Sequence, residues 1–300
     1  PAGTYICEVE IDPRSFQPDP NVAPYLTNAD LGVTPAEQQE KLKAQAREYV
    51  KKVVEVVLDL VDDAIKRLER AESQSEVAEN SRVHKLLIHG VPIEYRDPSG
   101  AVRTAGIHLI DFDNPANNDW LAVNQFTIIG NKNRRPDVLV FVNGIPLALL
   151  ELKNLANEHA TLKNAWNQVQ TYRKDIPAVF VPNAVTVISD GISAAMSSFS
   201  GGFEHYAPWK TIDGREVISS VPALEVLIKG VFEPSRFLDI VKNFIVFSEE
   251  TVTDKKSGQK TTVLIKRVAK YHQYWAVNAA VESTVDAAGP DGVQRAGEAF

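Results

Sequence analysis

The chain has 300 residues, 44% of them hydrophobic and 24% charged, which is the ordinary globular range and enough for one large domain or two small ones. Its single cysteine, Cys7, excludes a disulfide framework and a four-thiolate zinc site, and it favours a reducing compartment. Neither an apolar run of the roughly 18 to 20 residues that span a bilayer nor a secretory signal is visible. We therefore expect a cytoplasmic protein without a membrane segment.

The formal net charge of −7 argues against a protein whose whole surface clamps nucleic acid, because phosphate binding draws on dense Lys and Arg. Any DNA contact must be local. The best candidate is the segment GNKNRRPD, in which Lys132, Arg134 and Arg135 stand close together. On charge alone, a solvated loop explains these three cations equally well.

In chain order, residues 1–33 are rich in Pro, Asn and Asp and predict an irregular arm. A capping box at Thr34 to Glu37, with Pro35 at the first helical position, predicts the start of a long amphipathic helix that ends near Ala71. This helix either packs within the chain, which is the commoner outcome, or meets a partner subunit.

From Lys85 the pattern becomes alternating or continuously apolar and predicts successive strands. These strands are LLIHGVPIEY, AVRTAGIHLIDF, LAVNQFTIIG, DVLVFV and IPLALLEL. A turn at Pro98-Ser99-Gly100 closes one hairpin. Asn143-Gly144 is the strongest hairpin signal in the chain because both residues tolerate positive φ, so DVLVFV and IPLALLEL should be antiparallel neighbours.

A helix at about Thr161–Lys174 and a strand at Val185–Ile188 complete a mixed α/β core, a β-sheet flanked by helices. Further on we expect short helices at Pro222–Lys229 and Pro234–Phe244 and a turn at 255–258 between two extended segments. A last helix should begin near Arg267. The Gly-rich end of the sequence suggests that the natural chain continues.

Asp137, Glu151 and Lys153 are the best candidates for chemistry. If Asn143-Gly144 reverses the chain, Asp137 and Glu151 lie equidistant from the turn at one end of paired strands, so their side chains can converge. Glu151 and Lys153 are two positions apart and share a face. A surface ion pair at a strand end is the alternative interpretation.

This residue set suits Mg²⁺, which prefers hard oxygen ligands and bridges to phosphate oxygens. The two carboxylates and the backbone carbonyl of Leu152 would hold the ion, and the Lys153 ammonium would orient a water or stabilise developing negative charge. Metal-assisted hydrolysis is the reaction that this set predicts.

The segments NNDWLAVNQFTI, NRRPDVLVFVNGIPLALLELKN and AWNQVQTY closely resemble the restriction (R) subunits of type I restriction-modification enzymes, which carry a PD-(D/E)xK nuclease core. Pro136-Asp137 and Glu151-Leu152-Lys153 match the core motif. The resemblance implies a restriction-endonuclease-like fold, with Asp137 and Glu151 as metal ligands and Lys153 as the catalytic cation. It covers roughly Leu86 to Val281, while residues 1–80 do not match the family's usual opening.

Two further pairs carry the resemblance. Gln168 and Tyr172 match the family's Gln-x-x-x-Tyr motif and share one helix face, which implies a site role, although such residues are more often packing residues. Gln273 resembles the glutamine that reads adenine in related DNA motors, with Tyr271 as a stacking neighbour, but an ordinary helix residue is the commoner explanation.

The resemblance implies a DNA endonuclease region whose cutting follows ATP-driven translocation by downstream motor domains. We expect an arm and helix at 1–80, the nuclease domain at 81–250, and a linker with the start of the motor at 251–300. No G-x-x-x-x-G-K-[ST] loop is present, so ATP belongs only to the full-length subunit. The implied partners are double-stranded DNA and the methyltransferase and specificity subunits.

Other sites and functions were weighed. The six histidines lack metal-ligand spacing, and Asp111 and Asp113 are explained by a turn as well as by a cation site. A catalytically silent docking and coupling module is the alternative from another functional class, with the long helix as its binding element. A stand-alone repair nuclease of the same superfamily is a third possibility.

Overall fold

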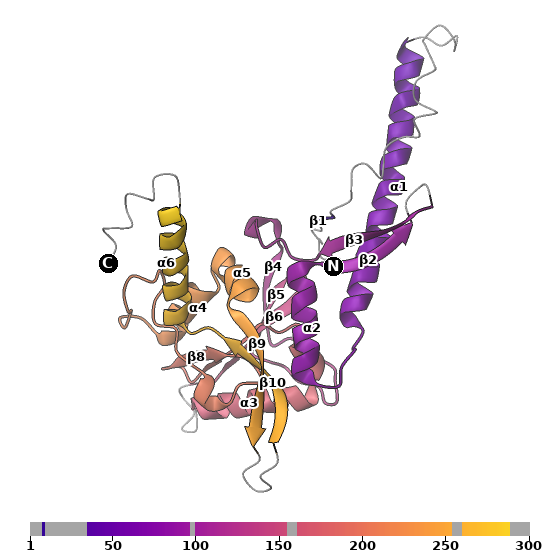
Figure 1. The fold of residues 1–300 in the computed structure, drawn as a ribbon. Coiled ribbons are helices and arrows are strands. Elements are labelled where there is room, and N and C mark those ends of the chain that lie inside the picture. The colour runs from indigo at the N-terminus through magenta and orange to yellow at the C-terminus, as the bar shows by residue number, and fades with distance from the viewer. Residues whose placement is uncertain (1–7, 10–34, 97–99, 155–160, 254–259, 289–300) are drawn as a thin grey trace. The chain divides into compact units, whose positions relative to one another are not determined.

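The computed structural model describes residues 8–9, 35–96, 100–154, 161–253 and 260–288, which form two compact units. One unit contains the described parts of 73–84 and 112–300, and the other contains those of 6–72 and 85–111. Figure 1 labels the elements of both. The functional division at residues 80 and 250 stays a prediction.

The smaller unit consists of one long helix and a small sheet. Helix α1 (Pro35–Glu69) begins at the predicted proline and ends close to the predicted residue. Its last turns bury Leu60, Val61 and Ala64, and the helix packs on two strands. The sheet has the order β1 (Glu8–Val9), β3 (Val102–His108) and β2 (Val91–Arg96), all antiparallel. Of the turn predicted between β2 and β3, residues 98 and 99 lie outside the described residues.

The expected strand starting near Lys85 is wrong in its first half, because helix α2 (Glu76–His89) runs through it. Asn80, Val83, His84 and Leu87 are buried at helical spacing. Gly90, with φ of +81°, ends the helix in the conformation that glycine adopts most easily. A short apolar run such as LLIH fits either a strand or a buried helix turn, so its periodicity could not decide.

The larger unit is built on a mixed sheet of five strands, in the order β4-β5-β6-β7-β8. The pairs β4–β5, β5–β6 and β7–β8 are antiparallel, while the central β6 pairs with β7 in parallel. This confirms the predicted α/β class with a mixed sheet. The strands are β4 (Trp120–Asn124), β5 (Val138–Val142), β6 (Ile145–Leu152), β7 (Val185–Ser189) and β8 (Ala194–Ser197).

The predicted hairpin is confirmed. Asn143 and Gly144 have φ of 50° and 79° between β5 and β6, as a two-residue turn of this hand requires. Helix α3 (Leu162–Asp175), whose N-cap Thr161 accepts a hydrogen bond from the backbone of Asn164, contacts β6 and β7. Its buried residues Ala165, Val169 and Tyr172 join the main hydrophobic cluster of the unit.

The strand expected over LAVNQFTIIG ends earlier, at Asn124. Gln125 takes a positive φ of 53°, which breaks the extended run, and Ile128 then forms only an isolated bridge with Arg134. Short 3-10 turns, η2 (Pro115–Asn117), η3 (Pro177–Phe180) and η4 (Phe203–His205), connect other elements of this unit.

The C-terminal elements follow the predicted order. They are α4 (Ala223–Val231), α5 (Pro234–Asn243), β9 (Ile245–Thr253), β10 (Lys260–Val268) and α6 (Tyr271–Ala288). The turn expected at 255–258 lies outside the described residues. The last helix starts later than expected, because Arg267 still pairs with Val246 across the β9–β10 ladder. No helix in the described ranges has the length and apolarity needed to cross a bilayer.

Candidate functional site

A β-bulge brings Asp137 and Glu151 opposite each other. The expectation that they are equidistant from the turn is wrong, since Asp137 precedes Asn143 by six positions and Glu151 follows Gly144 by seven. The register shifts between Val140 and Phe141, which leaves Leu147 as an extra residue in β6. Beyond this bulge Val138 pairs with Leu150, so Asp137 stands one step further on, opposite Glu151. The bulge corrects a one-residue mismatch that would place the two side chains on opposite faces.

Asp137 lies at the start of β5 and is held by its backbone and by its carboxylate. The backbone N–H of Gln125 donates to its carbonyl at 3.0 Å. The Oδ2 atom accepts the backbone N–H of Leu152 at 2.8 Å, and Oδ1 accepts from Gln125 Nε2 at 3.2 Å. The carboxylate therefore bridges the ends of β5 and β6 on the face that Glu151 occupies.

Glu151 is a buried carboxylate beside a cation. Its residue is only 2% exposed, and its Oε1 atom lies 2.5 Å from Lys153 Nζ. Its Oε2 atom is buried and has no hydrogen-bond partner among the residues that the structure describes. A buried carboxylate oxygen without a donor is costly and is usually explained by a water or an ion.

Helix α3 adds the predicted Gln168 and Tyr172 to the same place. Tyr172 is buried, and its hydroxyl lies within 3.5 Å of the Arg135 carbonyl, next to the chain segment that leads into Asp137. Its hydroxyl also interacts with the carboxylate of Glu151 and with the side chain of Gln168. The structure thus brings together all five residues that the sequence nominated for catalysis.

Burial dominates the electrostatics of this site. It raises the pKa of Glu151 above its usual range, and the charge of Asp137 raises that pKa further, while Lys153 and Tyr172 oppose the shift. Burial followed by the charge of Glu151 raises the pKa of Tyr172 well above its ordinary value. Tyr172 therefore remains a hydrogen-bond donor at any physiological pH.

The donor set fits a hard divalent cation coordinated through few protein ligands. Over the described ranges no group of three His, Cys, Asp or Glu residues is close enough to hold a metal. Two facing carboxylates, one of them with an unsatisfied oxygen, and a nearby backbone carbonyl such as that of Leu152 suit Mg²⁺, which keeps several of its waters.

The three predicted DNA-contacting cations have different surroundings. Arg134 forms an ion pair with the buried Asp175 at the end of α3, with Nη2 to Oδ2 at 2.5 Å, so it anchors its loop to the helix. Lys132 and Arg135 are exposed at the surface. Arg135 also donates from Nε to the Gln125 carbonyl at 3.2 Å, which holds it near the chain segment before Asp137.

Asp175 is a residue that the sequence reasoning did not identify. Besides its ion pair with Arg134, its backbone carbonyl accepts from Lys132 N at 3.3 Å. A Cβ atom on Gly130 would come within 2.5 Å of that carbonyl, so only glycine allows the loop to approach the helix end so closely. An acid at a helix C-terminus interacts unfavourably with the helix dipole. This placement was the one signal in the sequence that Asp175 has a specific partner.

The residues named for nucleotide binding lie elsewhere in this unit, at the start of α6. The side-chain oxygen of Gln273 accepts the backbone N–H of Lys270 at 2.9 Å, which is the helix-capping half of a capping box. The ring of Tyr271 meets that of His272 edge-on at 5.2 Å. Adenine recognition by Gln273 stays a prediction.

Comparison with known proteins places these features in one family. A family model described as type I restriction enzyme R protein N terminus matches residues 19–205. The type I restriction enzyme HindI endonuclease subunit of Haemophilus influenzae is 37% identical over 259 residues, covering 84% of this chain and 24% of that protein. The putative type I restriction enzyme MjaIXP endonuclease subunit of Methanocaldococcus jannaschii is 28% identical over 223 residues, covering 67% of this chain and 20% of that protein.

The chain therefore spans about a quarter or less of the length of these two relatives. The matched region, residues 19–205, includes Asp137, Glu151, Lys153, Gln168 and Tyr172 and more than half of the sequence. The chain belongs to the family of type I restriction enzyme R protein N-termini.

Proposed function

We propose that this R-subunit N-terminal region is a Mg²⁺-dependent endonuclease that hydrolyses DNA phosphodiester bonds non-specifically. The observation that carries the proposal is Glu151, a buried carboxylate that faces Asp137 across a hairpin and keeps one oxygen unsatisfied. What supports a cation site over a structural ion pair alone is the second acid, because Asp137 faces Glu151 and a pair of carboxylates favours a bound divalent ion.

Asp137, Glu151 and the Leu152 carbonyl would hold the ion. When bound, Mg²⁺ would supply Lewis-acid activation of a phosphate and lower the pKa of a water molecule. Leu152 is well suited to this role, because its own N–H is bonded to Asp137 and fixes the peptide beside the carboxylates.

Lys153 would supply the positive charge that the reaction needs. The ammonium, 2.5 Å from Glu151 and only partly exposed, is held next to the two acids rather than free in solvent. In this position it would orient the attacking water or stabilise the negative charge that develops on the phosphate oxygens. Tyr172 and Gln168 would hold the Glu151 carboxylate in place from helix α3.

The substrate would be duplex DNA, brought to the site with help from the exposed Lys132 and Arg135. The full-length subunit would add ATP-driven translocation, and the methyltransferase and specificity subunits would add target recognition. These whole-protein activities belong to the proposal, because this chain covers only 24% of its Haemophilus relative.

Metal binding tests the proposal directly. Isothermal titration of Mn²⁺ or Mg²⁺ into the chain should show at least about a tenfold weaker binding for Asp137→Ala, because a carboxylate ligand is lost. Asp213→Ala is the matched control, since Asp213 is an exposed acid outside the site, with a side chain 55% exposed. Identical metal binding by the parent and Asp137→Ala would refute the assignment.

A second candidate is the silent docking module, which the exposed face of α1 favours. Val50, Val54 and Leu58 stand at successive helical turns with 58%, 49% and 58% of their surfaces exposed, a pattern that marks protein contact surfaces. Lys153→Ala separates the two functions. In the assembled enzyme it should abolish DNA cutting and leave metal binding intact, whereas unchanged cutting would favour the docking module.

A further inference from the structure

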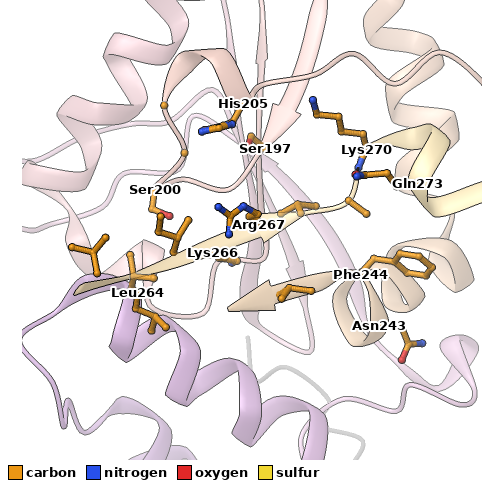
Figure 2. A pocket seen from close by; sticks show the side chains of 18 of the residues that line it. Ser197, Ser200, His205, Asn243, Phe244, Leu264, Lys266, Arg267, Lys270 and Gln273 are labelled. Atoms are coloured by element: carbon orange, nitrogen blue, oxygen red, sulfur yellow. Dashed lines mark hydrogen bonds between the residues drawn. The ribbon is translucent and has the colours of Figure 1, made fainter. Parts of the chain in front are cut away.

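A cavity lies in the larger unit, lined by residues other than the five of the proposed nuclease site. It has a volume of about 870 Å³ and runs between the 197–205 segment, strand β10 and the start of α6. Figure 2 shows His205, Arg267 and Lys270 extending from these three segments. We call it the Lys266 groove, after the buried lysine in its wall.

The groove gathers positive charge in an acidic protein. Arg173, Lys266, Arg267, Lys270 and His205 all line it, and no Asp or Glu occurs among the described lining residues. The whole chain carries −7, so this concentration of cations departs from the average surface. Arg173 and Arg267 have acidic partners, Glu76 and Glu250, so the uncompensated charge that could attract an anion comes mainly from Lys270.

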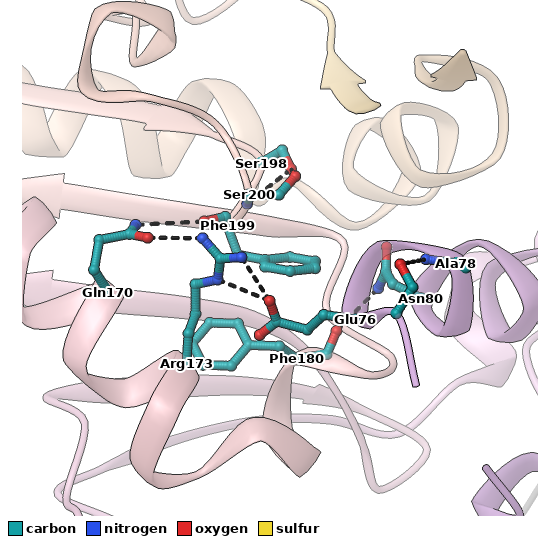
Figure 3. A network of polar contacts seen from close by, with 10 residues as sticks. Glu76, Ala78, Asn80, Gln170, Arg173, Phe180, Ser198, Phe199 and Ser200 are labelled. Atoms are coloured by element: carbon teal, nitrogen blue, oxygen red, sulfur yellow. Dashed lines mark hydrogen bonds and ion pairs between the residues drawn. The ribbon is translucent and has the colours of Figure 1, made fainter. Parts of the chain in front are cut away.

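Two of these cations are fixed at the base of the groove. Arg173 is held by Glu76, with Nη2 to Oε2 at 2.5 Å, and by Gln170 at 2.7 Å, as Figure 3 shows. The Phe199 ring lies between Arg173 and Lys266, at 5.4 and 5.5 Å from their charged groups. Lys266 is 2% exposed and donates to the Asn183 carbonyl at 2.5 Å, a neutral partner that leaves its charge uncompensated.

The outer cations are accessible. Lys270 is exposed, and its ammonium forms no ion pair within the described part of the chain. Arg267 pairs with Glu250 and donates to Ser248 Oγ at 2.6 Å, but this pair is itself half exposed, so it is weak and exchangeable. The remaining wall is apolar and includes Phe244, Val246, Val263 and Leu264.

We propose that the Lys266 groove binds the sugar-phosphate backbone of a single nucleic-acid strand, with the bases against its apolar wall. Single-strand sites combine a basic track for phosphates with aromatic side chains on which bases stack. Here Arg267 and Lys270 would provide the track, and Phe244 stands in the wall. The proposal goes beyond the nuclease function, because a strand can bind in the groove whether or not Asp137 holds a metal.

Size and hydrogen bonding favour a strand over two other phosphate ligands. The cavity holds only about 870 Å³, which suits a segment of one strand better than a duplex. A mononucleotide phosphate usually requires a cradle of free backbone N–H groups. Here the N–H of Gly201 donates to the Ser198 carbonyl and that of Ser200 to Ser198 Oγ, so neither is free for a phosphate.

The affinity for a dye-labelled single strand of about six nucleotides, measured by fluorescence anisotropy, tests the proposal; this length lies within the usual size of single-strand sites. The measurement is made at several salt concentrations, with EDTA to remove divalent metal. Arg267→Glu/Lys270→Glu should weaken binding at least about tenfold and reduce the salt slope by about 1.4, because each phosphate contact contributes about 0.7. Lys43→Glu/Lys66→Glu is the matched control on α1, where both lysines are exposed. This control should leave the affinity within about twofold.

Three results would overturn the proposal. The first is equal strand affinity of the parent and the groove variant. The second is a duplex that binds as tightly as the strand and is weakened equally by the groove variant. The third is tight binding of ATP that the groove variant abolishes, which would make the ligand a mononucleotide. Asp137→Ala should leave strand binding unchanged, so failure here is distinguishable from failure of the nuclease proposal.

Discussion

Glu151 and Lys266 are both almost fully buried charged side chains, but their surroundings differ. Glu151 faces a cation, Lys153, and a second acid, Asp137, and it retains an unsatisfied oxygen. Lys266 lies near two aromatic rings and a carbonyl, and another cation, Arg173, also lies near Phe199. Burial raises the pKa of Glu151 and lowers that of Lys266, so each environment favours the neutral form.

The difference teaches which ligand each site lacks. A carboxylate pair with one neighbouring cation can be completed by a positive ion, and a groove with an unpaired lysine can be completed by an anion. The two sites therefore make different predictions for charge-changing variants and for pH. The predictions below test this contrast, from the largest expected effect to the smallest.

The largest effect is expected from Glu151→Gln. The variant keeps the shape of the side chain but removes the buried negative charge, so cutting should fall by about a hundredfold or more. Plasmid cleavage by the assembled enzyme with Mg²⁺ measures it. Glu94→Gln, at an exposed position of β2, is the control and should cut like the parent. Near-parental cutting by Glu151→Gln would place the reaction elsewhere.

A pH dependence of metal affinity should come next. Because the pKa of Glu151 is raised, metal binding must displace a proton once the pH falls toward that pKa. The affinity for Mn²⁺ should then fall by up to about tenfold per pH unit on the acid side and level off above it. Calorimetry across pH measures it, and a flat profile down to the usual range of a glutamate would contradict the raised pKa.

The basic site should show its pH dependence in the stability of the fold. The pKa of Lys266 is about 7 in the folded protein and 10.5 in an exposed chain, so the unfolded chain binds more protons between these values. Stability should therefore rise with pH across this window, by at most about 1.4 kcal/mol per pH unit. Lys266→Met should lose this contribution, and Lys270→Met is the exposed control. Parallel pH profiles for the parent and Lys266→Met in chemical unfolding would contradict it.

Much of the proposed nuclease site could be predicted from the sequence. The hairpin at Asn143-Gly144, the long first helix and the convergence of Asp137, Glu151 and Lys153 are local signals, because turn residues and strand alternation act over a few positions. The bulge at Leu147 escaped prediction, since nothing in a uniformly apolar strand marks which residue is extra. Packing against neighbouring elements decides the register there.

The groove could not be predicted at all. Its cations are spread from Arg173 to Lys270, and only the three-dimensional fold gathers them. Tertiary packing also explains why the strand expected near Lys85 was wrong. LLIH is part of helix α2, and residues one helical turn apart in that helix are buried. The ion pair of Arg134 could not be predicted either, because its partner Asp175 is remote in the sequence.

The smallest effects are expected from alanine substitutions of two glutamines, one near each site. Gln273 caps α6 through Lys270 N, so Gln273→Ala should lower stability by about 0.5 to 1 kcal/mol and leave strand affinity within about twofold. Gln168 interacts with the Tyr172 hydroxyl, so Gln168→Ala should leave stability nearly unchanged and slow cutting. Thermal unfolding and plasmid cleavage of both variants measure the pair of effects. If Gln273→Ala abolished ligand binding without loss of stability, Gln273 would be a ligand-reading residue and the groove a nucleotide site.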